Sequence, residues 1–151
     1  MEFGSLMVKK IHILRVDPGE DVLASVRTFL GESGLKQAVV LGAYGTLAEH
    51  HIHWVRNNKI PASDIHGTGE GGIEILSMNG LVAEGEPHIH VALSTPAGAY
   101  GGHLEPGCIA YVLCEVFFAE VEGLTLRRTR AKVSVPAMGE GEVPRLRFGP
   151  D

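Results

Sequence analysis

Apolar and polar residues alternate along much of the chain, which is the pattern of β-strands that bury one face. Residues 56–59 are polar and indicate a turn, and residues 60–72 are rich in Gly and indicate a loop. The dipeptide Asn79-Gly80 is typical of a hairpin turn. We expect strands at residues 9–16, 37–41, 46–55, 73–78, 81–83, 86–94, 108–121 and 124–135.

Helical spacing of apolar residues occurs once, directly after Asp17-Pro18-Gly19-Glu20. Asp17 can cap a helix, Pro18 suits the first helical position, and Glu20 stands where a capping box needs an acidic residue. Gly31 or Gly34 would end this helix. The apolar stripe consists of Val22, Leu23, Val26, Phe29 and Leu30. The pattern therefore predicts an α+β fold, with a mainly antiparallel sheet of about seven strands and one N-terminal helix.

The 151 residues suit one domain with a hydrophobic core. Residues 1–6 read as a cloning scar, and residues 7–135 form the expected domain. Residues 136–151 are rich in Gly and Pro and indicate a loosely ordered tail. The side chains of Leu146 and Phe148 could attach this tail to the domain.

Two segments suggest close contacts between backbones or subunits. The glycines in residues 42–45 permit close approach to a ligand or to another chain. Residues 108–121 are apolar on both faces, which predicts a central strand or one covered by another subunit. Glu115 lies within that strand and needs a partner, either a structural one or an imidazole that binds a metal.

Histidines supply the candidate chemistry. His88 and His90 lie on the same face of the strand at 86–94, roughly 6.5–7 Å apart along it. His103 follows a segment rich in Pro, Gly and Ala that is long enough to turn the chain back. Two imidazoles fixed by a strand and a third from a glycine loop predict a three-histidine metal site with open coordination positions. His51 and His53 form a second pair on one face and are reserve ligands.

Zinc is the usual ion for imidazole ligands, although nickel, copper and iron also accept them. The alternative interpretation is that these histidines are only solvated or hydrogen-bonded, as histidines on half-polar strand faces often are. An open metal position could hold water or an anionic ligand such as a carboxylate. A metal-bound water could become a nucleophile if Glu86, Glu105 or Glu115 lies close enough to act as a base.

Charge favours a cation over a polyanion. The net charge is −5, and residues 60–126 contain no Lys or Arg but nine acidic residues. Such a field attracts cations and repels nucleic acid. Basic residues cluster at 127–132 and 145–147, where a solvated strand face is the simpler interpretation.

No apolar run reaches the ~18 residues of a membrane span, so we expect no membrane association. Cys108 and Cys114 would lie roughly 20 Å apart on one strand, too far to form a disulfide, and are expected to be buried apolar residues. This use of cysteine indicates a reducing, cytoplasmic setting.

The order of these motifs resembles that of the PPC (plants and prokaryotes conserved) domain family. The matching segments are residues 14–20, 42–47, 73–80, His88-Ile89-His90 with Leu93-Ser94, Gly101-Gly102-His103-Leu104 and the strand that contains Glu115. The resemblance implies a compact α/β domain that forms a homotrimer and occurs alone in prokaryotes. It also implies metal at the matching histidines. Many prokaryotic members are named as predicted DNA-binding proteins, but the AT-hook of the plant members is absent from these 151 residues.

Three functional hypotheses follow. The first is a divalent metal held by His88, His90 and His103 in a homotrimer, where it serves a small-molecule or metal-dependent site. The second is a DNA-associated regulatory module, which the charge pattern disfavours. The third is a structural role with trimer formation as its main product.

Overall fold

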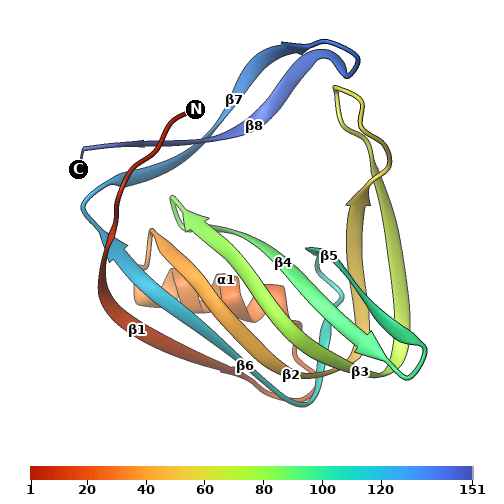
Figure 1. Ribbon diagram of the computed structural model, residues 1–151. Helices are drawn as coiled ribbons and strands as arrows, with labels where there is room; N and C mark the ends of the chain where they lie inside the picture. The colour runs from red at the N-terminus through yellow and green to blue at the C-terminus, as the bar shows by residue number, and fades with distance from the viewer. Residues whose placement is uncertain (151) are drawn as a thin grey trace.

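The computed structural model describes residues 1–150, and these contain eight strands and one short helix (Figure 1). The strands pair antiparallel, as the alternating pattern predicted. No helix of the described residues is long and apolar enough to cross a membrane. The elements are β1 (Met7–Val16), α1 (Val22–Ser33), β2 (Ala38–Val55), β3 (Asp64–Ala83), β4 (Glu86–Thr95), β5 (Gly98–Leu104), β6 (Ile109–Glu122), β7 (Thr125–Val135) and β8 (Gly139–Gly149).

The main sheet has six strands in the order β1-β6-β2-β3-β4-β5, and β5 also pairs with β2. Because β5 pairs with β2 as well as with β4, the four strands β2, β3, β4 and β5 form a closed ring. The remaining strands, β7 and β8, form a separate two-stranded hairpin that we call the arm. Figure 1 shows the arm crossing above the sheet and reaching the loop between β2 and β3.

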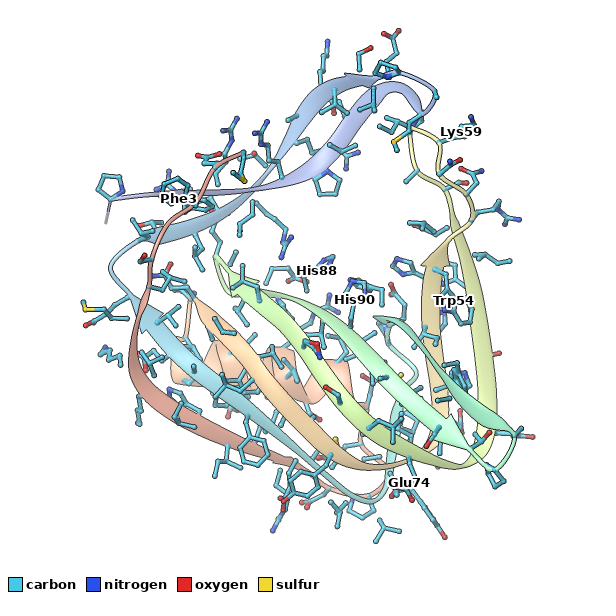
Figure 2. All side chains as sticks on the ribbon, in the orientation of Figure 1. Phe3, Trp54, Lys59, Glu74, His88 and His90 are labelled. Carbon is cyan, nitrogen blue, oxygen red and sulfur yellow. The ribbon has the colours of Figure 1, made fainter. Side chains whose placement is uncertain are left out.

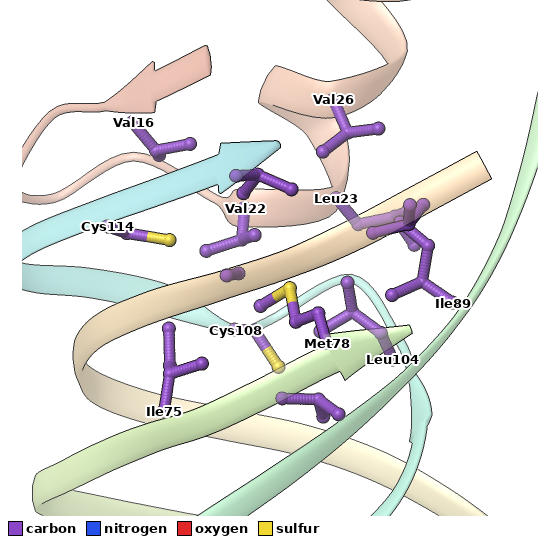
Figure 3. Packing of buried hydrophobic residues seen from close by; sticks show 14 of the residues in the cluster. Val16, Val22, Leu23, Val26, Ile75, Met78, Ile89, Leu104, Cys108 and Cys114 are labelled. Atoms are coloured by element: carbon purple, nitrogen blue, oxygen red, sulfur yellow. The ribbon is translucent and has the colours of Figure 1, made fainter. Parts of the chain in front are cut away.

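Helix α1 covers one face of the sheet, and the core lies between them (Figure 3). Val22, Val26 and Leu30 of α1 are almost completely buried in this core. The predicted cap was wrong, because Asp21 rather than Asp17 caps the helix and accepts a 2.8 Å hydrogen bond from the Ala24 amide. A bridge between Asp21 and Ile109 keeps Asp21 extended, so the helix begins after it. Of the two predicted ends, Gly34 terminates the helix in the left-handed conformation.

Strands β2 and β3 are longer than predicted. Strand β2 continues through the glycines at 42–45, and β3 includes residues 64–72, which were expected to form a loop. The hairpin prediction at Asn79-Gly80 was also wrong, because both residues lie inside β3 and the turn falls at Glu84-Gly85, where φ is 56° and 82°. Gly80 has a different role, because a Cβ there would overlap the carbonyl oxygen of His88 on the neighbouring strand.

The C-terminal segment forms β8 along Gly139–Gly149, where we expected a loosely ordered tail. Leu146 and Phe148 do dock it, because they pack against a small buried cluster that includes Leu126 and Val121. The run of backbone hydrogen bonds with β7 gives this segment its order.

Strand β6 is central in the sheet, between β1 and β2. This confirms the first of the two alternatives predicted for residues 108–121, a central strand. Its inner face is buried, and Cys114 lies there as a free thiol, as does Cys108 just before the strand. Its outer face is not covered within the chain, because Tyr111 is 56% and Leu113 40% exposed.

Candidate metal centre at a histidine cluster

Strand register aligns four histidines in one row across the sheet. His66 of β3 pairs with His53 of β2, His53 pairs with His103 of β5, and His103 pairs with His90 of β4. Directly paired residues point to the same face of a sheet, so the side chains of this row are neighbours. Figure 2 shows His88 and His90 pointing into the space between the sheet and the arm.

The three predicted ligands lie together. The ring centroid of His103 is 4.6 Å from that of His88 and 5.5 Å from that of His90, and the His88 and His90 rings are 5.3 Å apart. A tetrahedral ion about 2.0–2.1 Å from each ring nitrogen would hold the centroids roughly 5 Å apart. The centroid spacing matches three imidazoles around one ion, but the candidate ligand nitrogens of these three rings do not all lie within 4.8 Å of one another, so the rings would have to turn to share an ion.

Glu105 joins the cluster from the other side. Its Oε1 accepts hydrogen bonds from Nδ1 of His53 at 2.6 Å and Nδ1 of His103 at 3.2 Å. His53, His103 and Glu105 form the only group among the described residues whose candidate ligand atoms all lie within 4.8 Å of one another. Two hydrogen bonds to one oxygen are enough to explain that compactness. They also leave Nε2 of each ring free.

The two reserve histidines both contact His66, whose ring centroid is 5.1 Å from that of His51 and 5.4 Å from that of His53. His53 also stacks on His103, with a centroid distance of 4.5 Å. Nδ1 of His51 donates to the Pro106 carbonyl at 2.8 Å, and its Nε2 lies 2.9 Å from Nδ1 of His66. Sequence reasoning did not include His66, because residues 60–72 were assigned to a loop and its pairing with β2 was not expected.

The environment of His88 and His103 favours the neutral imidazole, which is the form that binds metals. Burial, aided by the charges of Arg128 and the neighbouring histidines, lowers the pKa of His88 to about 4. Burial and the nearby His53 also lower the pKa of His103, although Glu105 acts in the opposite direction.

Glu105 remains ionised. Burial acts to raise the pKa of Glu105, but hydrogen bonds and charge interactions with His53 and His103 outweigh it, so the pKa lies below its usual value. The centre thus combines the neutral imidazoles of His88 and His103 with one carboxylate that orients the His53 and His103 rings, an arrangement typical of protein metal sites.

The other two acidic candidates do not contact the cluster. Glu115 accepts a hydrogen bond from the Tyr44 hydroxyl and therefore has a structural partner. Glu86 pairs with Arg27 on the helix at 2.7 Å. Of the three carboxylates that we considered as a base or as an acceptor for a ligand imidazole, Glu105 alone has a hydrogen bond to a histidine of the cluster.

A cavity of ≈ 880 Å³ opens in front of the cluster. His53, His88, His90 and His103 line its floor, and Trp54 stands beside them, donating a 2.5 Å hydrogen bond to the Gly101 carbonyl. The arm contributes the remaining side of the cavity. A space of this size suits a small molecule.

Comparison with known proteins places the chain among relatives with the same fold. A metal-containing protein from Archaeoglobus fulgidus is 27% identical with a TM-score of 0.71, and the match covers 93% of this chain and 96% of that one. A plant- and prokaryote-conserved (PPC) protein from Pyrococcus horikoshii is 28% identical with a TM-score of 0.70, covering 87% of this chain and 92% of that one.

Curated relatives are much longer. The bifunctional protein GlmU of two Synechococcus strains, JA-3-3Ab and JA-2-3B'a(2-13), is 29% and 30% identical over 118 residues, which are 78% of this chain. The match spans only 18% and 17% of those two proteins.

The family model of the Plants and Prokaryotes Conserved (PCC) domain matches residues 4–122, which include β1 to β6 and every histidine of the cluster. This is the family expected from the motifs, under a slightly different abbreviation. The chain belongs to the Plants and Prokaryotes Conserved domain family.

Proposed function

We propose that this protein binds one divalent metal ion through His88, His90 and His103, and that the ion forms part of a small-molecule site in a homotrimer. The observation that carries the proposal is the meeting of the three rings, with centroids 4.6–5.5 Å apart, from two neighbouring strands. The similarity to a metal-containing archaeal protein at 27% identity supports it. Zinc is the ion that we propose, because it favours neutral imidazole ligands.

In this proposal Glu105 and His53 support the site but do not bind the metal. The carboxylate accepts hydrogen bonds from His103 and His53, so it holds the His103 ring with Nε2 free to bind an ion. A bound ion supplies positive charge and an open position for water or an anionic ligand. The competing arrangement is a site made by His53, His103 and Glu105 themselves.

Metal analysis of protein purified without a His-tag column tests the proposal. We expect about one ion per chain in the wild type, and loss of most of it in His88→Ala and His103→Ala. His12→Ala is the matched control, because His12 lies on β1 and bonds Glu120 at 3.0 Å instead. Metal that survives His88→Ala but is lost in His53→Ala would refute the proposed ligands in favour of the competing set.

The exposed outer face of the sheet supports the homotrimer. Tyr44 and Tyr111 are 50% and 56% exposed there, and Ile11 and Ile13 are 49% and 66% exposed on β1. A large apolar surface of this kind is typical of a subunit interface. Sedimentation equilibrium should give three times the chain mass of 16.1 kDa, and a monomer would contradict the proposal.

A DNA-associated role is the second candidate, and the observation that favours it is the basic arm. The arm carries six of the 13 Lys and Arg residues of the chain, namely Arg127, Arg128, Arg130, Lys132, Arg145 and Arg147. Phosphate neutralisation by such residues dominates DNA affinity. Anisotropy of a labelled duplex from low to physiological salt tests this role, and absence of binding throughout would exclude it.

A further inference from the structure

The arm lies outside the segment that the family model matches, yet it forms part of the cavity wall. The family match ends at residue 122, and the arm begins at Thr125. Arg130 of β7 and Glu142, Val143 and Pro144 of β8 line the cavity together with the histidines. Four of the residues that line the cavity therefore come from beyond the matched segment.

Both ends of the arm are fixed to the body. At its base, Leu126 is 3% exposed in the small buried cluster. At its tip, the Ile60 amide donates to the Met138 carbonyl at 2.9 Å, and Lys59 Nζ donates to the Ala137 carbonyl at 2.9 Å. A Cβ at Gly139 would lie 2.6 Å from the Ile60 carbonyl oxygen, so the contact depends on glycine. These two anchors keep the arm in place over the cavity (Figure 2).

The arm brings positive charge to a region that otherwise lacks it. Arg130 is the only Lys or Arg among the described residues that line the cavity. Its Nε lies 3.4 Å from Glu142 Oε2, with the two side chains 67% and 52% exposed. An exposed ion pair at this distance is weak, so the guanidinium can exchange Glu142 for another carboxylate. Arg128 lies two residues before Arg130 on β7, so its side chain is on the same face of the strand and nearer the base of the arm.

We infer that the arm selects a small ligand with a carboxylate and an apolar group, which binds between the metal ion and Arg130. This inference rests on the proposed metal site. The ion and the Arg130 guanidinium would both offer positive charge to a carboxylate in the cavity. Trp54, Val143 and Pro144 provide apolar surface for the rest of the ligand. The cavity of ≈ 880 Å³ limits the ligand to a small molecule.

Cobalt-loaded protein titrated with benzoate, and with benzamide as the neutral analogue, tests the inference. The visible bands of cobalt report changes at the metal, and calorimetry gives the affinity. We expect benzoate to bind at least tenfold more tightly than benzamide. Arg130→Gln should weaken benzoate binding about tenfold, because it removes a charge-assisted hydrogen bond. Glu142→Gln should tighten it by removing the internal competitor.

Arg127→Gln is the control, because it removes the same charge from the same strand but Arg127 does not line the cavity. Equal effects of Arg127→Gln and Arg130→Gln would overturn the role of Arg130, as would equal binding of benzoate and benzamide. Both results leave the metal site standing. Failure of the wild type to bind cobalt would overturn the metal site and this inference together.

Discussion

Replacement of Gly80 by Ala perturbs the strand pairing that positions His88. Gly80 pairs with Ile89 on β4 and with Val40 on β2, in the middle of the sheet. A Cβ at Gly80 would overlap the His88 carbonyl oxygen and lie 3.0 Å from the Ile89 Cα. Both are backbone atoms of a central strand, so β4 has to move away from β3 to admit the methyl group.

Overpacking of this kind costs about 1–3 kcal/mol of the free energy of unfolding. For a chain of this size, each kcal/mol lowers the melting temperature by about 2–4 °C, so we expect a decrease of roughly 2–12 °C. Because the displaced segment carries His88, the affinity for zinc should fall as well. Thermal unfolding followed by circular dichroism and a zinc competition titration measure the two effects.

Gly72→Ala is the matched control. Gly72 lies on the same strand, and a Cβ there would meet nothing within 4 Å. Because Ala restricts the unfolded chain more than Gly does, this variant should be neutral or more stable by up to about 1 kcal/mol. A melting temperature of Gly80→Ala within 1 °C of wild type, or an equal loss in Gly72→Ala, would refute the reasoning.

Two further predictions concern ionisable groups in and near the site. Glu105→Gln should lower zinc affinity by roughly 10–100-fold, because it weakens the acceptor that orients two imidazoles, and competition with a chromogenic chelator measures it; unchanged affinity would show that the carboxylate does not act on the metal. Burial raises the pKa of Cys108 to about 11 and that of Cys114 to about 12, so at pH 8 both thiols are protonated. They should react with Ellman's reagent only after the protein unfolds, and rapid reaction of the native protein would contradict their burial.

Local patterns in the sequence predicted the faces of single strands well. The alternation in residues 86–94 placed His88 and His90 on one side, and the structure puts them on one side of β4 with their ring centroids 5.3 Å apart. The return of His103 also follows from local features, because β5 pairs directly with β4 through a short turn. Contacts between neighbouring elements depend on few residues and are therefore visible in the sequence.

Pairing between distant segments was not predictable in the same way. His53 meets His103 only because β2 pairs with β5, 50 positions further along the chain. Glu105 was one of three carboxylates under consideration, and only that register places it between the two rings. Asn79-Gly80 illustrates the opposite error, because a strong local turn signal was overridden by pairing with strands on both sides.

Anomalous diffraction at the zinc edge, from crystals of tag-free protein, tests the central claim most directly. The account predicts one peak per chain, about 2.0–2.1 Å from a ring nitrogen of each of His88, His90 and His103. An absence of any peak would contradict it, as would a peak bound by His53, His103 and Glu105 without the two histidines of β4.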